Sequence, residues 1–221
     1  MQPKLLIFDW DGTLADTTNP IIETVQQAFY ECGLAKPPAD RIRNLIGRSL
    51  MQMMQLAPSA GMGKHEELVE TYAAHYLNPN NRHMRLFPDV PPTLERLREA
   101  GYWLSVATGK GRSGLNQAIA QTGTEDFWLA TACASECPSK PAPDMVWRLC
   151  DELGVTPSES IVIGDTAFDL EMAAHAGARG IGVATGAHSR ETLQSAPNIG
   201  ILSCFGELEG FLQRQGSIEA V

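Results

Sequence analysis

The feature that most constrains this chain is a short apolar run that ends in two aspartates. Leu5–Phe8 is aliphatic and aromatic, which is typical of a buried strand. Asp9 follows the run directly, Asp11 comes two residues later, and Gly12 allows a tight turn. In open α/β sheets, ligands and reacting groups collect at the carboxyl ends of the strands. The sequence therefore predicts two carboxylates held close together at one edge of a sheet.

This pair of carboxylates suits covalent phosphoryl transfer. A carboxylate can act as nucleophile and carry an aspartyl-phosphate, a role that falls to Asp9. Asp11 can then protonate the leaving oxygen and later activate a water molecule. Because two close carboxylates repel each other and a phosphate, the pair also favours Mg²⁺ as cofactor. The structural alternative is two aspartates that cap the amides of the turn. An EF-hand loop is disfavoured, because its later ligands are missing.

Length and charge limit the classes of function. With 221 residues the chain can form one large domain or two small ones. Its 17 basic and 26 acidic residues give a net charge of −9, which argues against a nucleic-acid partner but not against a small anionic substrate. No apolar run approaches the ~18 residues of a membrane span, and the start of the chain does not resemble a signal peptide. We therefore expect a cytoplasmic protein with no membrane partner. Its oligomeric state cannot be read from the sequence, and its five scattered cysteines predict reduced thiols.

The chain divides into a helical stretch and an alternating stretch. Residues 16–85 carry several helices, the first of them predicted to begin with Asn19 as N-cap and Pro20 in the first turn. Residues 86–221 alternate between strands and helices, which predicts an α/β fold, a Rossmann-like three-layer parallel sheet core. Since the first strand finds partners only beyond residue 100, residues 1–15 and 86–221 would form the core. Residues 16–85 would be an inserted helical domain that covers the active loop and excludes water.

Two later loops carry candidate phosphate-binding groups. Thr108 follows an apolar run, and its hydroxyl together with the amide of Gly109 can bind phosphate oxygens. Lys140 precedes a proline-rich loop, where its ammonium can pair with the nucleophile and the transferring phosphoryl group. Each also has an ordinary interpretation: a structural threonine at a strand end, and a surface lysine.

A second pair of aspartates follows another buried strand. The predicted strand Ser160–Ile163 runs through Gly164 into Asp165, where an uncompensated charge would be costly. Asp169 lies four residues on, within the first turn of the next helix and facing back toward Asp165. Two carboxylates at this place favour a metal site. The alternative is a helix N-cap at Asp165 with Asp169 stabilised by the helix dipole.

These four stretches, taken in order, resemble the motifs of the haloacid dehalogenase superfamily. They are Asp9–Leu14, Ala107–Lys110, Ser139–Pro143 and Gly164–Asp169, and they span nearly the whole chain. The helical stretch after the first motif looks like the small helical cap of that superfamily. Within it, the chain most resembles the phosphoglycolate phosphatase-like group.

The resemblance implies a Mg²⁺-dependent phosphatase acting on a small phosphorylated metabolite, which would be phosphoglycolate-like, a sugar phosphate or a nucleotide. It makes Asp9 the nucleophile and Asp11 the general acid and base. It places Mg²⁺ on the Asp9 carboxylate, the Asp11 backbone carbonyl and Asp165, with Asp169 orienting the waters of the metal.

The resemblance also implies the residues that hold the substrate. Thr108, Gly109 and Lys140 would hold the phosphoryl group. Arg48 lies in a break of the helical stretch that is similar to a substrate-contacting cap loop in relatives. It is a candidate substrate contact, and a solvated arginine at a helix start is the alternative.

Several other functions fit parts of the same pattern. A phosphomutase of the β-phosphoglucomutase type shares all four motifs and would need a bisphosphate to sustain turnover. A protein that uses the fold only for binding is a further alternative, because a fold does not guarantee activity. The dehalogenase and phosphonate-cleaving branches are disfavoured, because they lack the second aspartate of the first motif and Asp11 is present here.

Overall fold

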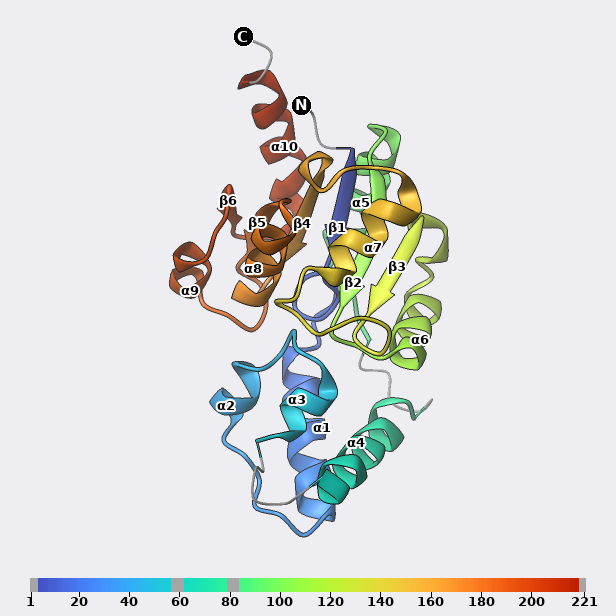
Figure 1. The fold of residues 1–221 in the computed structure, drawn as a ribbon, viewed down its shortest axis with the longest axis vertical. Coiled ribbons are helices and arrows are strands. Elements are labelled where there is room, and N and C mark those ends of the chain that lie inside the picture. The colour runs from blue at the N-terminus through green and yellow to red at the C-terminus, as the bar shows by residue number, and fades with distance from the viewer. Residues whose placement is uncertain (1–3, 57–61, 79–83, 219–221) are drawn as a thin grey trace.

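Six parallel strands form one sheet with the order β3-β2-β1-β4-β5-β6 (Figure 1). The computed structural model describes residues 4–56, 62–78 and 84–218. The central strand pairs with β2 on one side and β4 on the other, so that Leu5 lies opposite both Trp103 and Ser160. The strands are β1 (Leu5–Phe8), β2 (Trp103–Thr108), β3 (Ala130–Cys133), β4 (Ser160–Gly164), β5 (Arg179–Val183) and β6 (Gly200–Leu202).

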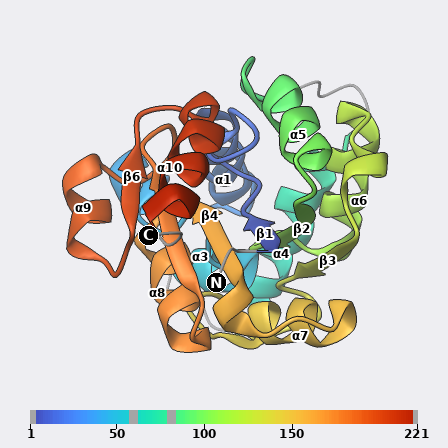
Figure 2. The same ribbon diagram turned by 90° about the horizontal axis from the view of Figure 1, so that it is seen from above.

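Helices cover both faces of the sheet (Figure 2). One face carries α5 (Val90–Glu99), α6 (Arg112–Thr122) and α10 (Leu208–Ile218). The other carries α7 (Asp144–Leu153) and α8 (Ala167–Ala176), and α9 (Arg190–Ser195) lies near β6. Short 3-10 helices are η2 (Glu125–Phe127), η3 (Pro157–Glu159) and η4 (Phe205–Glu207). The predicted α/β fold with a Rossmann-like three-layer core is therefore confirmed.

The central strand is buried on both faces, as expected for a parallel sheet between two helical layers. Leu6 and Phe8 pack into the cluster beneath α5, α6 and α10. Leu5 and Ile7 pack into the opposite cluster beneath α7 and α8. Burying such a side chain contributes about 1.5–3 kcal/mol. This packing holds the carboxyl end of β1 in a fixed position.

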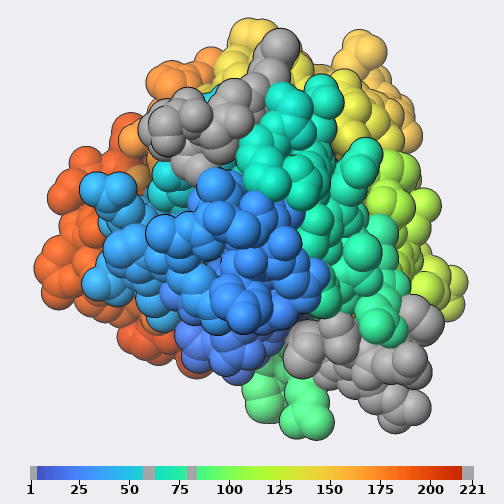
Figure 3. All heavy atoms as spheres, turned by 90° about the horizontal axis from the view of Figure 1, so that it is seen from below, coloured from blue at the N-terminus to red at the C-terminus, as the bar shows by residue number. Residues whose placement is uncertain are grey.

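Among the described residues between β1 and α5 there are four helices, which we call the inserted helices. They are α1 (Thr18–Glu31), α2 (Ala39–Arg43), α3 (Leu50–Met54) and α4 (Met62–Tyr76). They lie below the carboxyl ends of the strands in Figure 1, and α1 and α4 run side by side on the face seen in Figure 3. They share a hydrophobic cluster that includes Val25, Phe29 and Leu68.

The two connections between the inserted helices and the sheet run next to each other. Ala15 and Leu86 form an antiparallel bridge, and the amide of Asp16 donates to the carbonyl oxygen of Arg85. The division of the chain into domains at these two points stays a prediction. Across the described residues, no helix combines the length and the apolar character needed to span a membrane.

The predicted start of the first helix is wrong. The helix begins at Thr18 rather than after Asn19, and Thr17 occupies the N-cap position. The hydroxyl of Thr17 makes no capping bond, because it donates instead to Asp11. The site therefore uses the side chain that would otherwise cap the helix.

Candidate active site

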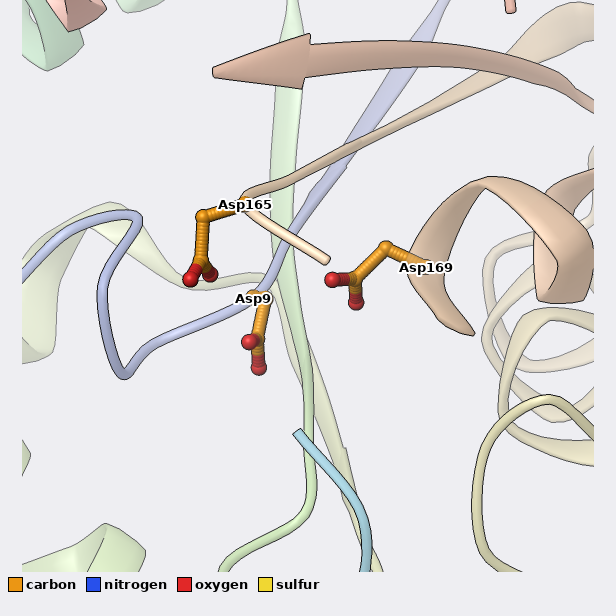
Figure 4. Close-up of side chains that lie close together, drawn as sticks. All are labelled: Asp9, Asp165 and Asp169. Atoms are coloured by element: carbon orange, nitrogen blue, oxygen red, sulfur yellow. The ribbon is translucent and has the colours of Figure 1, made fainter. Parts of the chain in front are cut away.

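Three carboxylates converge beneath the carboxyl ends of β1 and β4 (Figure 4). The chain leaves these two adjacent strands toward opposite sides of the sheet, which creates the crevice where α/β proteins bind ligands. Asp9 follows β1, Asp165 follows β4, and Asp169 lies in the first turn of α8. One oxygen of each lies within 4.8 Å of the others. The structure thus brings together three of the predicted site residues.

Asp165 is fixed from both sides by neighbouring loops. Its Oδ1 accepts a 2.8 Å hydrogen bond from the hydroxyl of Thr13, and its Oδ2 a 2.7 Å bond from the amide of Ala187. The backbone turn at Gly12 has φ 81°, and a Cβ there would collide with the Asp165 carboxylate. Glycine at this position therefore lets the first motif approach the fourth closely.

Asp169 belongs to both a helix cap and the carboxylate cluster. Its Oδ2 accepts hydrogen bonds from the amide and the hydroxyl of Thr166, at 3.1 and 2.7 Å, and the bond from the amide is one half of a capping box. Its Oδ1 lies 2.7 Å from Lys140 Nζ. The N-cap of α8 is thus Thr166, and Asp165 is not used as a cap.

Lys140 is the cation of the cluster. It is fully buried, and its Nζ lies 2.6 Å from Asp9 and 2.7 Å from Asp169. Asp9 Oδ1 makes the ion pair with Lys140, whereas Asp9 Oδ2 has no hydrogen-bond partner among the described residues. One ammonium therefore faces two buried carboxylates, with a third carboxylate close by.

Burial and mutual repulsion determine how this cluster titrates. Burial raises the pKa of Asp9 to about 7, although Lys140 acts in the opposite direction. Burial, followed by the charges of Asp9 and Asp169, raises the pKa of Asp165 well above its usual value. Burial also disfavours the charged form of Lys140, but the two carboxylates outweigh it and raise the pKa of the ammonium. The cluster therefore carries more carboxylate groups than its one cation can neutralise.

Two observations indicate that the cluster could bind a divalent cation. Asp9 Oδ2 has no hydrogen-bond partner among the described residues and its carboxylate lies beside that of Asp165, and burial raises the pKa of both carboxyl groups. A hard cation with oxygen ligands would supply the missing positive charge, and Mg²⁺ prefers such ligands.

Asp11 turns away from the cluster and joins a different network. Its Oδ1 accepts a 2.6 Å hydrogen bond from the Thr17 hydroxyl and lies 2.8 Å from Lys110 Nζ. Lys110 also donates to the hydroxyl of Tyr76, at 2.6 Å, at the end of α4. Thr13, Thr17, Lys110 and Tyr76 are not among the predicted site residues. Thr13 and Lys110 stand inside the first and the second motif, whereas no sequence signal marks Thr17 or Tyr76.

The second motif lies where β2 ends. Thr108 is buried, and its hydroxyl accepts a hydrogen bond of 3.3 Å from the amide of Lys110. Gly109 faces the loop of residues 47–49, and a Cβ there would collide with the carbonyl oxygens of Gly47 and Arg48. The amide of Ser49 donates to the Ser139 hydroxyl at 2.8 Å. The inserted helices therefore contact the second and third motifs directly.

Arg48 reaches the fourth motif. Its guanidinium lies 4.3 Å from the ring centroid of Phe168, a cation–π contact, and its buried Nε has no hydrogen-bond partner among the described residues. Arg48 is half-buried, and its role as a substrate contact stays a prediction. It lines the same cavity as Asp9 and Asp11, together with Gly109.

This cavity has a volume of about 380 Å³ and lies between the motif loops and the inserted helices. Pockets that bind small molecules typically have ~300–1,000 Å³. A buried cluster of acids, a lysine and a cavity open to solvent on one side occur together at one end of the sheet, which is the arrangement of an enzyme active site.

The sequence profile of the haloacid dehalogenase-like hydrolases matches residues 6–203. The chain belongs to this family. The predicted resemblance is thus confirmed, and so is the assignment of the chain to a family of hydrolases.

Individual members of the haloacid dehalogenase-like hydrolases resemble the chain over most of its length. A phosphoglycolate phosphatase of Aquifex aeolicus is 28% identical over 180 residues, covering 80% of this chain and 82% of that protein. A phosphoglycolate phosphatase of Vibrio vulnificus is 26% identical, covering 87% and 89%. The crystal structure of a Bacteroides fragilis protein described as haloacid dehalogenase-like has a TM-score of 0.87 and 25% identity, covering 94% of this chain and all of that one. These names agree with the predicted phosphoglycolate phosphatase-like group.

Proposed function

We propose that the protein is a Mg²⁺-dependent phosphatase that hydrolyses a small phosphomonoester through an aspartyl-phosphate on Asp9. The observation that carries the proposal is the different surroundings of the two aspartates of the first motif. Asp9 lies buried with Oδ1 on Lys140 and Oδ2 without a partner among the described residues, and Asp11 faces the cavity and a separate lysine. These surroundings support the role of nucleophile for Asp9 and of proton carrier for Asp11.

In the first step, an oxygen of Asp9 attacks phosphorus and the bond from phosphorus to the ester oxygen breaks. Asp11, in its protonated form, gives its proton to the leaving oxygen, so that an alcohol departs. In the second step, Asp11 takes a proton from water as the water oxygen attacks phosphorus. Phosphate is released, and Asp9 returns to its free carboxylate.

The remaining motif residues hold the phosphoryl group. Lys140 neutralises charge next to Asp9, and Thr108 and the amide of Gly109, which lines the cavity, would bind phosphate oxygens. Arg48 adds a cation from the inserted helices. Mg²⁺ held by Asp9, the Asp11 carbonyl and Asp165, with its waters oriented by Asp169, would supply positive charge for the developing negative charge on phosphorus.

We infer that residues 16–85 act as a cap on a core of residues 1–15 and 86–221. The two connections lie side by side at the bridge between Ala15 and Leu86, so the inserted helices can move as a unit. The contacts of residues 47–49 with Gly109 and Ser139 close the cavity over Asp9. A closed cap excludes water from the reacting phosphorus until it is needed.

The experiment is phosphate release from a panel of phosphoglycolate, sugar phosphates, nucleoside monophosphates and pyrophosphate, with and without Mg²⁺. We expect metal-dependent release that Asp9→Asn abolishes while circular dichroism shows the fold intact. Release without a bisphosphate primer would distinguish the phosphatase from a phosphomutase. No release from any compound would contradict the proposal, and a binding role would then remain.

A further inference from the structure

The cavity is larger than a phosphoryl group and a short polar chain require. Its volume of about 380 Å³ corresponds to about a dozen water molecules at ~30 Å³ each. Asp9, Asp11 and Gly109 lie at its motif end, where the phosphoryl group would bind. The rest of the space extends toward the inserted helices, so it is available to the leaving group of the ester.

The wall formed by the inserted helices is apolar. It includes Leu50 and Met53 from α3, and Val69, Tyr72 and Leu77 from α4 and the residue after it. Tyr72 stacks on the neighbouring Tyr76, with ring centroids 5.3 Å apart and planes 14° apart. A carboxylate or a sugar hydroxyl placed against such a wall would lose its hydrogen bonds to water without replacement. An aromatic or aliphatic group would be stabilised there.

Three of the charges that line the cavity belong to the motifs, and the fourth, Arg48, comes from the inserted stretch and reaches back to the fourth motif. Among the described residues that line it, the charged ones are Asp9, Asp11, Arg48 and Lys110. Lys110 is paired with Asp11, and the guanidinium of Arg48 lies on Phe168, next to the fourth motif. The cations thus face the acids and the phosphoryl site, so a second anionic group on the substrate would meet the apolar wall.

We infer that the substrate is a phosphomonoester whose alcohol is apolar, an aromatic or branched aliphatic group that packs against Leu50, Met53, Val69 and Tyr72. The inference rests on the proposed phosphatase function and names the substrate class of that site. The phosphoryl group binds at the motif end, and the apolar group fills the space beneath the inserted helices.

The first test compares benzyl phosphate with phosphoglycolate. Both esters contain the same CH₂–O–P unit and differ in whether a phenyl ring or a carboxylate is attached, so the reacting bond is closely matched. We expect kcat/KM for benzyl phosphate to exceed that for phosphoglycolate by about tenfold or more, the discrimination that an apolar pocket can give. Equal values, or a preference for phosphoglycolate, would overturn the inference and leave the phosphatase function intact.

A binding measurement separates this inference from the proposed function. Phenethylphosphonate and phosphonopropionate are the non-hydrolysable counterparts of the two esters, and calorimetry measures their affinity even if no ester is turned over. Binding of phenethylphosphonate that is tighter by about tenfold supports the apolar site. Equal or weaker binding of phenethylphosphonate contradicts it.

Two neighbouring alanines of α4 provide a matched pair of variants. Ala73 lines the cavity, whereas Ala74 is exposed on the same helix. Ala73→Phe fills the apolar space, so the ratio of kcat/KM for benzyl phosphate to that for methyl phosphate should fall about tenfold. Ala74→Phe should leave this ratio near the wild-type value. An unchanged ratio in Ala73→Phe would overturn the inference.

A second variant covers the case in which Ala73→Phe does not fold. Val69→Thr keeps the shape of the side chain and introduces a hydroxyl into the same wall. The benzyl-to-methyl ratio should then fall several-fold, because the polar group weakens the apolar contact. A ratio equal to that of the wild type would count against the apolar site.

Discussion

Lys110 Nζ lies 2.8 Å from Oδ1 of Asp11, and both side chains are buried. The same ammonium is 2.6 Å from the hydroxyl of Tyr76, which belongs to the inserted helix α4. Burial and the nearby Asp11 raise the pKa of Tyr76 well above its usual value, so the phenol stays neutral and can bind the lysine as an acceptor. The proton-carrying aspartate is thus connected to the inserted helices through one lysine.

The connection predicts the effect of Tyr76→Phe. Without the hydroxyl, Lys110 loses one partner and Asp11 is held less firmly. A hydrogen bond of this kind contributes about 0.5–1.5 kcal/mol, so kcat should fall about 2- to 10-fold in steady-state kinetics. The control is Tyr30→Phe, since Tyr30 is 65% exposed. If kcat of Tyr76→Phe equals that of the control, the hydroxyl does not position Asp11.

The close approach of the loop of residues 47–49 to Gly109 predicts that a larger residue at position 109 lowers activity. Gly109→Ala would drive a Cβ into the carbonyl oxygens of Gly47 and Arg48, so the loop must move outward. We expect kcat/KM to fall by about tenfold or more, because small displacements of positioned groups are costly to catalysis. In Gly111→Ala the Cβ meets nothing within 4 Å, so the loss should be much smaller. Similar losses of kcat/KM in the two variants would show that activity does not depend on the close approach of residues 47–49 to Gly109.

The sequence predicted the part of the site that is local to each motif. Asp9 and Asp165 each follow a buried strand, and parallel strands bring their carboxyl ends to the same edge of a sheet. Asp9 and Asp165 therefore converge because β1 and β4 are neighbouring parallel strands. Asp169 joins them because it lies in the first turn of the helix that follows Asp165. The fold class could be predicted from the spacing of the motifs and from the helices predicted between them.

The contacts between the inserted helices and the core could not be predicted from the sequence. No local pattern shows that Lys110 meets Tyr76, because the two residues come from separate elements whose packing is set by the whole fold. The first helix illustrates the same limit. Asn19 has the residue type of a good N-cap, but the helix begins at Thr18 and the hydroxyl of Thr17 binds Asp11. A tertiary contact overrides the local preference there.

Lys140 predicts a large effect on stability as well as on activity. Lys140→Met would leave Asp9 and Asp169 buried without their cation. Removing one partner of a buried ion pair costs about 3–5 kcal/mol, and we expect a loss of that size in urea unfolding near pH 8 without divalent cations. Lys36→Met is the control, because Lys36 is exposed and such changes stay within about 0.5 kcal/mol. A loss of less than about 1 kcal/mol for Lys140→Met would contradict the role of the ion pairs.

The raised pKa of Asp9 predicts how the stability of the metal-free protein depends on pH. The pKa of Asp9 is about 7 in the folded protein, compared with the ordinary value of 3.8 for an aspartate in the unfolded chain. Between these two values the folded state holds a proton that the unfolded state has lost. The stabilisation of the folded state by this proton is fully present below the unfolded-state pKa, and it is lost as the pH rises through the folded-state pKa. The free energy of unfolding should therefore fall by a few kcal/mol between about pH 4 and pH 8.

Mg²⁺ should reverse this loss, because it binds the ionised carboxylates and competes with their protons. We expect millimolar Mg²⁺ to raise the melting temperature much more near pH 8 than near pH 5. Asp165→Asn removes one charge of the cluster and should shrink the Mg²⁺ effect near pH 8. A Mg²⁺ effect that is equal at the two pH values, or unchanged in Asp165→Asn, would show that the cation does not bind at these carboxylates.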